Sequence, residues 1–199
     1  LLEAGTEPEH EDLARTVLER AVTLIRDEDS LVPLPEVSHL LVATVDDDGP
    51  SKPGAPEPGA AFADALGETV YEADTLYFGP DTGAEKIESL LGVAQNYGTA
   101  VVLVFARPRA WKGDGVLSGR AKLILAELNR LVERTVVIIF GSPYIFHECD
   151  GAGAVLCLYD TSDTAEEVAA DALLGRASIN GRLPVTLSDE LPRGFGLER

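Results

Sequence analysis

The chain has 199 residues, enough for one domain with a sizeable core, and its hydrophobic (45%) and charged (25%) fractions are typical of a globular protein. Acidic residues outnumber basic ones by 34 to 16, and the resulting net charge of −18 argues against nucleic acid or an anionic membrane surface as a partner. The sequence has no apolar run approaching the roughly 20 residues of a transmembrane helix, and its start does not resemble a signal peptide.

The acidic residues are spread along the whole chain, and only four of the 16 basic residues are lysines. We interpret this composition as a surface adapted to high salt, where mobile ions screen self-repulsion. The alternative is a protein of ordinary habitat that is simply acidic. The chain begins at Leu1 and contains no methionine, from which we expect it to be a piece of a longer or processed polypeptide.

The first predicted element is a helix. Thr6 and Glu9 form a capping-box pattern at its start. Apolar residues then recur at helical spacing from Leu13 to Ile25. Because proline disfavours helix in the residue before it, the helix is predicted to end before the proline-containing segment 31–35.

Beyond this helix, strand-like and helix-like segments alternate. The predicted strands are 39–45, 75–78, 99–106, 135–140, 154–159 and a short one at 183–187, and the predicted helices are 60–66, 84–97, 118–133 and 164–174. The stretch 46–59 contains four prolines and three glycines and is predicted to be an exposed loop. Several strands are apolar on both faces, which is typical of a parallel sheet covered on each side by helices. We therefore predict a single α/β domain, a three-layer sandwich with a mostly parallel, doubly wound sheet of five to six strands.

Asp46 to Asp48 follow the first predicted strand and suggest a Mg²⁺ or phosphoacceptor site. Such a site also needs an aspartate at the end of the 99–106 strand, where the sequence has Ala106. We therefore interpret the three aspartates as part of a solvated turn. Cys149 and Cys157 lie in no metal-binding spacing, and Cys157 is predicted to be a buried small hydrophobe. The sequence predicts neither a metal nor another cofactor.

Two further patterns depart from the motifs that they resemble. The glycines from Gly113 to Gly119 have GxGxxxG spacing rather than the GxGxxG of a dinucleotide-binding turn. Ser142 and His147 suggest a nucleophile and its base, but a nucleophile elbow needs GxSxG. Pro143 also removes the backbone N–H that such an elbow uses for its oxyanion hole. We assign no catalytic role to either pattern.

Three segments resemble the C-terminal domain of family 3 glycoside hydrolases. The segment 24–34 is similar to its "LLKNE…LLPL" opening, 136–146 (VVIIFGSPYIF) to its "VVVxxGNPY" turn, and 175–185 to its closing "G…xxGRLPV" signature. The segments occur in the family's order and span most of the chain. Asp27 and Ser142 each replace an asparagine of the family pattern.

The resemblance implies that the chain packs against an N-terminal (β/α)₈ barrel of the same polypeptide, which carries the nucleophilic aspartate of a retaining enzyme. In the β-glucosidase branch the second carboxyl comes from the C-terminal domain. Here the loop 107–115 contains no glutamate and only Asp114 as a carboxylate. The β-N-acetylglucosaminidase branch takes its acid/base from the barrel, so this branch is favoured. We therefore expect no catalytic residue in this chain.

The resemblance thus predicts an accessory domain of a hydrolase that acts on a carbohydrate substrate with β-linked sugars, inactive by itself. The alternative is a stand-alone, non-catalytic binding or interaction module of the same fold. Within the loop 107–112 stand three cations and the only tryptophan, in a strongly acidic chain. We predict that Arg107, Arg109 and Trp111 lie near the substrate, with the tryptophan ring against a sugar. In the alternative interpretation, Trp111 caps the core and the cations balance nearby acids.

Overall fold

The computed structural model of the chain describes residues 8–28, 30–35, 39–50, 54–67, 73–107 and 117–199. The described strands form one six-stranded sheet in the order β1-β6-β5-β4-β2-β3. The strands are β1 (Thr23–Asp27), β2 (Leu40–Asp46), β3 (Ala73–Phe78), β4 (Thr99–Ala106), β5 (Arg134–Gly141) and β6 (Ala154–Leu158). Strands β2 to β6 are mutually parallel, and β1 lies antiparallel to β6 at one edge. The prediction of a mostly parallel sheet is confirmed.

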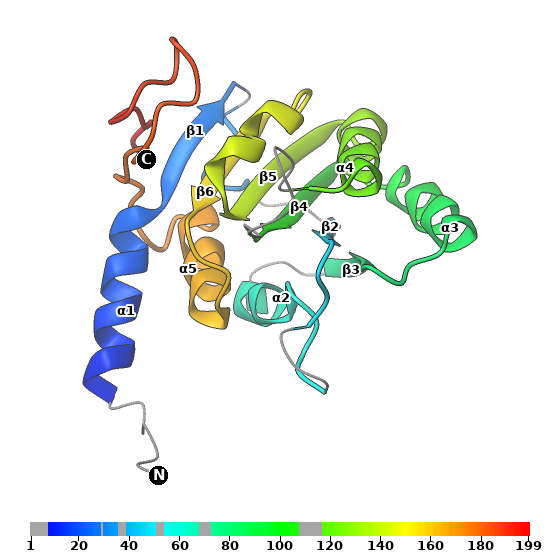
Figure 1. The fold of residues 1–199 in the computed structure, drawn as a ribbon, viewed down its shortest axis with the longest axis horizontal. Helices are drawn as coiled ribbons and strands as arrows, with labels where there is room; N and C mark the ends of the chain where they lie inside the picture. The colour runs from blue at the N-terminus through cyan, green and yellow to red at the C-terminus, as the bar shows by residue number, and fades with distance from the viewer. Residues whose placement is uncertain (1–7, 29, 36–38, 51–53, 68–72, 108–116) are drawn as a thin grey trace.

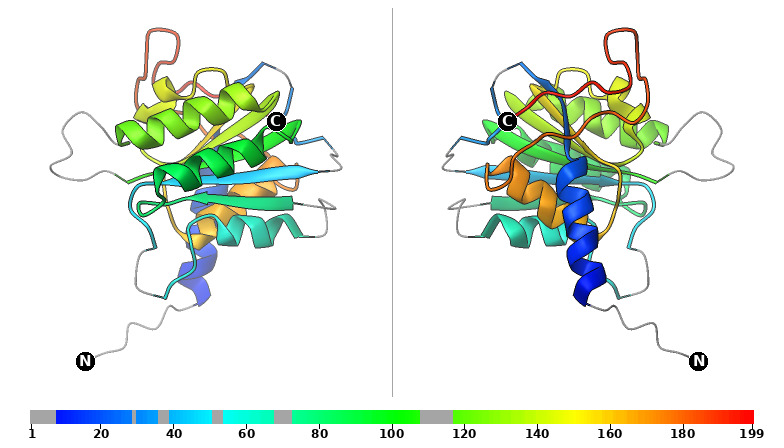
Figure 2. Two further views of the ribbon diagram at one scale, coloured as in Figure 1. Left: turned by 90° about the vertical axis from the view of Figure 1, so that its right-hand side faces the viewer. Right: turned by 90° about the vertical axis from the view of Figure 1, so that its left-hand side faces the viewer.

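Helices cover both faces of this sheet (Figures 1 and 2). The helices are α1 (Pro8–Ala21), α2 (Ala60–Leu66), α3 (Ala84–Ala94), α4 (Gly119–Leu131), the 3₁₀ helix η2 (Pro143–Glu148) and α5 (Asp163–Leu173). On one face α2 and α5 pack together, and α1 lies against α5. On the other face lie α3, α4 and η2. The arrangement is the predicted three-layer sandwich.

The alternation of side chains along each central strand divides the core into two layers. Leu103 and Phe105 of β4 pack toward α2 and α5, whereas Val102 and Val104 pack toward α3 and α4. The Phe105 ring stacks on Phe140 of β5, with ring centroids 4.8 Å apart. Each fully buried side chain of this size contributes about 1.5–3 kcal/mol, so the two layers hold the sheet and its helices together.

The first predicted helix extends too far along the chain. Helix α1 ends at Ala21, and residues Thr23–Asp27 form β1, which pairs with β6. Leu24 and Ile25 belong to opposite core layers, as adjacent residues of a strand do. Their spacing from Val17 fits a helix equally well, and only the pairing with β6 decides in favour of a strand.

The predicted final strand at 183–187 is also wrong. No residue of this segment belongs to the sheet. The Leu183 N–H donates to the Phe195 carbonyl at 2.8 Å, and the Leu187 N–H donates to the Leu191 carbonyl at 2.9 Å. The segment therefore forms its backbone hydrogen bonds with the residues that follow it and not with a strand of the sheet. The sheet edge is instead covered by Leu197, whose N–H donates to the Leu24 carbonyl at 2.9 Å.

Candidate functional site

The order of the strands fixes where a site is expected. From β2 the chain passes to β3 on one side, and then to β4 on the other side of β2. Ligands of open α/β sheets gather at the carboxyl ends of the strands where the order reverses in this way. Asp46, the last residue of β2, and Arg107, which follows β4, stand at this point.

Asp46 is the centre of a hydrogen-bonded cluster at this point. Its fully buried carboxylate accepts the N–H of Asp48 at 3.1 Å and of Gly49 at 2.8 Å. The hydroxyl of Tyr77 donates to Oδ2 at 3.3 Å, and Nη1 of Arg107 donates to Oδ1 at 3.0 Å. Burial raises the pKa of Asp46, and the two backbone N–H groups and the guanidinium oppose this shift. The Asp46 carboxylate thus fixes the turn after β2. It also binds the side chains of Tyr77, from β3, and of Arg107, which follows β4.

The next aspartate of the run has a structural role. The carboxylate of Asp47 accepts the Ser118 N–H at 2.6 Å and the Ser118 hydroxyl at 2.7 Å. Ser118 in turn accepts the N–H of Ala121 and caps α4, as the sequence predicts. Within the part of the chain that the structure describes, no group of three His, Cys, Asp or Glu side chains is placed to hold a metal ion.

Arg107 is the one predicted substrate-proximal residue that the structure describes; Arg109 and Trp111 lie outside the described residues. The Arg107 side chain is 25% exposed, so it remains accessible to solvent while it forms an ion pair with Asp46. The guanidinium carbon lies 5.4 Å from the centroid of the Phe105 ring. Arg107 is therefore a fixed cation at the carboxyl edge of the sheet.

The structure does not bring Ser142 and His147 together as nucleophile and base. Nε2 of His147 lies 3.2 Å from the Leu187 carbonyl oxygen, and the Ser142 N–H donates to the Ala106 carbonyl. The turn between β5 and η2 is nevertheless tightly built. Gly141 has φ +102°, and a Cβ at this position would lie 2.5 Å from the Ala106 carbonyl oxygen. This turn links two neighbouring strands and carries no catalytic pair.

The two cysteines are buried and free. Burial raises the pKa of Cys149 to about 12 and also raises the pKa of Cys157. Both thiols stay protonated at neutral pH and are poor nucleophiles. The prediction that Cys157 is a buried small hydrophobe is confirmed.

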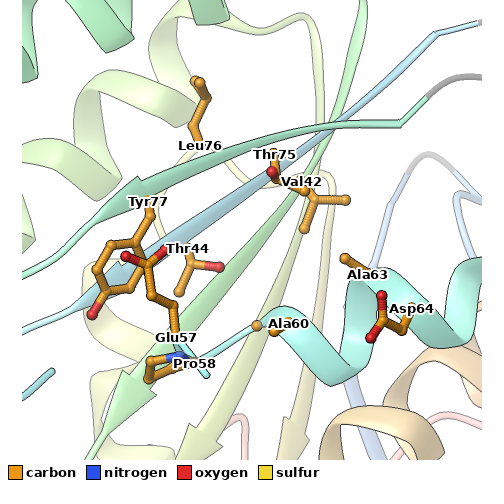
Figure 3. Close-up of a pocket in the computed structure, with 11 residues that line it drawn as sticks. Val42, Thr44, Glu57, Pro58, Ala60, Ala63, Asp64, Thr75, Leu76 and Tyr77 are labelled. Atoms are coloured by element: carbon orange, nitrogen blue, oxygen red, sulfur yellow. The ribbon is translucent and has the colours of Figure 1, made fainter. Parts of the chain in front are cut away.

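A pocket of about 290 Å³ lies between α2 and the neighbouring strands β2 and β3 (Figure 3). Thr44 and Val42 of β2 and Thr75 and Tyr77 of β3 form its floor, and α2 with the preceding Glu57 forms a wall. Sequence reasoning missed this pocket. The available signal was the alternation along β3, where Thr75 and Tyr77 place polar groups on one face of the strand.

The wall of this pocket is held in place by Glu166 of α5. This side chain is buried, and its carboxylate accepts the N–H of Gly59 at 3.0 Å and of Phe62 at 3.1 Å. Burial raises its pKa, and these N–H groups oppose the shift. Gly59 has φ +94°, and a Cβ there would lie 2.3 Å from Oγ1 of Thr44. Both features bring the start of α2 close to β2.

Comparison with known proteins identifies solved structures with a similar fold. Neither the protein family models nor the curated proteins include a match to the chain. Among solved structures, a family 3 β-N-acetylglucosaminidase from a Paenibacillus species matches with a TM-score of 0.73 at 17% identity, over 94% of this chain and 35% of that one. A β-glucosidase from Listeria innocua, solved with glucose, matches with a TM-score of 0.73 at 15% identity, over 98% of this chain and 34% of that one.

A fungal multi-domain family 3 β-N-acetylglucosaminidase also matches, with a TM-score of 0.70 at 17% identity, over 91% of this chain. The chain spans 19% of the length of this fungal protein and about a third of the other two. At these identities the likeness establishes a shared fold. Among the described residues, no helix combines the length and the apolar character needed to cross a bilayer.

Proposed function

We propose that the chain is the accessory, C-terminal α/β domain of a glycoside hydrolase that acts on β-linked sugars of the β-N-acetylglucosaminide or β-glucoside type. In this proposal it packs against a catalytic (β/α)₈ barrel of the same polypeptide. The observation that carries the proposal is the fold match over 94% and 98% of this chain to enzymes of these two activities. The matched region is about a third of each enzyme, as a domain within a larger hydrolase would be.

The positions of the family-like segments support the proposal. Segment 24–34 contains most of β1, segment 136–146 contains most of β5 and the turn into η2, and segment 175–185 follows α5. The last segment passes very close to the end of α1. A Cβ on Gly181 would lie 2.3 Å from the Val22 carbonyl oxygen. The last segment therefore forms a close-packed joint of the fold, as the second does at Gly141, and such packing explains a sequence pattern without catalytic groups.

The proposed division of chemistry follows from the contacts of the carboxylates. A retaining glycosidase needs two carboxyl groups about 5 Å apart across the scissile bond. At the switch point the buried carboxylate of Asp46 binds Arg107 and Tyr77, and the carboxylate of Asp47 binds Ser118, the residue that caps α4. We therefore assign this chain a supporting role, in which Arg107, with Arg109 and Trp111, contacts the sugar held by the barrel.

Kinetics of the full-length gene product test the proposal. We expect that product to hydrolyse aryl N-acetyl-β-glucosaminides or aryl β-glucosides, and the 199-residue chain to be inactive. Arg107→Ala and Trp111→Ala should each lower kcat/KM of the full-length enzyme roughly 10- to 200-fold, the scale of one lost pocket contact. Arg130→Ala is the matched control, because this exposed arginine of α4 pairs only with Glu127 among the described residues.

Turnover by the isolated chain that survives repurification would contradict the accessory role. A full-length product without glycosidase activity would favour the stand-alone binding module. If Arg107→Ala and Arg130→Ala behave alike, the loop after β4 does not face the substrate.

A further inference from the structure

The pocket between α2 and β3 is lined by polar groups that form no hydrogen bond with the described part of the protein. Thr44 is only 5% exposed, and its hydroxyl points into the pocket (Figure 3). This hydroxyl has no hydrogen-bond partner among the described residues. Thr75 on the neighbouring strand also lines the pocket, but its side chain is exposed and its hydroxyl can bond water. Buried polar groups are normally hydrogen-bonded. Since the hydroxyl of Thr44 has no partner among the described residues, it can bond a molecule that is bound in the pocket.

The charge of the pocket has one sign. Glu57 and Asp64 both line it, and no lysine or arginine is among the residues that do. Neither carboxylate forms an ion pair with a described residue. Both carboxylates are exposed, so they attract a cation bound beside them through charges that water screens in part and that the protein itself does not neutralise.

The aromatic ring in the pocket adds to the same preference. Tyr77 lines the pocket together with Glu57 (Figure 3). The phenol hydroxyl donates to Asp46, and burial with this carboxylate raises the pKa of Tyr77, so the ring stays neutral. The face of a neutral phenol ring attracts cations.

We propose that this pocket binds a small hydroxylated organic cation, that is, a protonated primary amine that also carries hydroxyl groups. The ammonium group lies between the Glu57 carboxylate and the Tyr77 ring, and the ligand hydroxyls bond Thr44 and Thr75. A volume of about 290 Å³ is at the small end of ligand pockets, which suits a ligand of monosaccharide size. The inference does not depend on the proposed hydrolase role, because the Arg107 loop is not among the residues that line this pocket.

Calorimetric titration of the 199-residue chain with 2-amino-2-deoxyglucose and with glucose tests the proposal, because the two probes differ in one substituent. At pH 7 and low salt the amino sugar should bind at least about tenfold more tightly than glucose, the scale of one charge-assisted hydrogen bond. Its affinity should fall as NaCl is added. Equal affinities for the two sugars would overturn the requirement for a cation.

Three variants locate the binding. Glu57→Gln should weaken amino-sugar binding about tenfold or more, and Thr44→Val should weaken it about threefold or more without changing the response to salt. Glu88→Gln removes the same charge from α3, outside the pocket, and should leave the affinity within about twofold. Glu57 is exposed, so its substitution should leave the melting temperature unchanged. If Glu88→Gln weakens binding as much as Glu57→Gln, the amine senses only the overall charge and the pocket assignment fails.

Discussion

At the scale of single residues, the turn after β5 shows how strongly one backbone position constrains the sequence. Gly141 has a positive φ, and the Ala106 carbonyl oxygen occupies the space that a side chain would need. The obstacle is main chain in the central strand β4, which cannot move aside cheaply. The sequence has Gly141 and Pro143 here, residues that are typical of a turn. It could not show the close approach of β4, which is 35 residues earlier in the chain.

Gly141→Ala should therefore destabilise the fold by about 3 kcal/mol or more, through strain at a positive φ together with the overlap. Gly151→Ala is the matched control. Gly151 also has a positive φ (+83°), but its added Cβ would meet nothing closer than 3.7 Å. This control should lose only the strain, about 1–2 kcal/mol. Urea denaturation of both variants measures the difference, and equal losses would show that the overlap with Ala106 costs nothing.

At the scale of elements, local patterns predicted most of the fold, and long-range pairing accounts for what they missed. Helix 60–66 and strand 99–106 have the predicted bounds, because each has its own apolar pattern and breaking residues at both ends. Strand β1 was missed because its partner, β6, lies about 130 residues away. The candidate site shows the same limit. Arg107 was named from its local setting, but its contact with Asp46 crosses 61 positions.

The joint between α2 and α5 rests on one carboxylate. The two acceptor oxygens of Glu166 serve two backbone N–H groups at the start of α2. Glu166→Gln leaves one acceptor oxygen for these donors and should cost about 1–3 kcal/mol at pH 7. Glu167→Gln, next in sequence, removes an exposed ion pair with Arg15 and should cost less than about 1 kcal/mol.

The pH dependence of this joint has a definite sign. Because burial raises the pKa of Glu166, the folded state binds this proton more tightly than the unfolded state does. The stabilisation from the protonated carboxyl is complete below the unfolded pKa and is lost as pH rises through the folded pKa. The melting temperature of the unmodified chain, relative to Glu166→Gln, should therefore increase as pH falls from 7 toward 4. A constant difference would show that the folded and unfolded pKa values of Glu166 are equal.

At the scale of the whole molecule, the dominant quantity is the charge of −18. Most ion pairs in the described regions are partly exposed and each contributes little, so they do not offset the repulsion among the remaining acids. Repulsion of this kind lowers the free energy of unfolding at low ionic strength. Salt should relieve it, because the screening length falls to about 3 Å near 1 M.

We therefore expect the melting temperature to rise as NaCl is increased from dilute to molar concentration. Sodium chloride is the appropriate salt, because sulfate also strengthens apolar burial and would raise the midpoint for another reason. A flat or falling midpoint would remove the argument that this surface is adapted to high salt.

The antiparallel edge of the sheet also sets an order of events during synthesis. Strand β1 leaves the ribosome early, but β6 and Leu197, between which it lies, are translated only after residue 153. Until then β1 has no sheet partner, although Leu24 and Ile25 give it apolar groups on both faces. A nascent or truncated chain that stops before β6 thus exposes an unpaired apolar strand, a feature that promotes association between chains. Completion of this domain depends on its last strand, and the nascent chain needs protection from aggregation until that strand has been made.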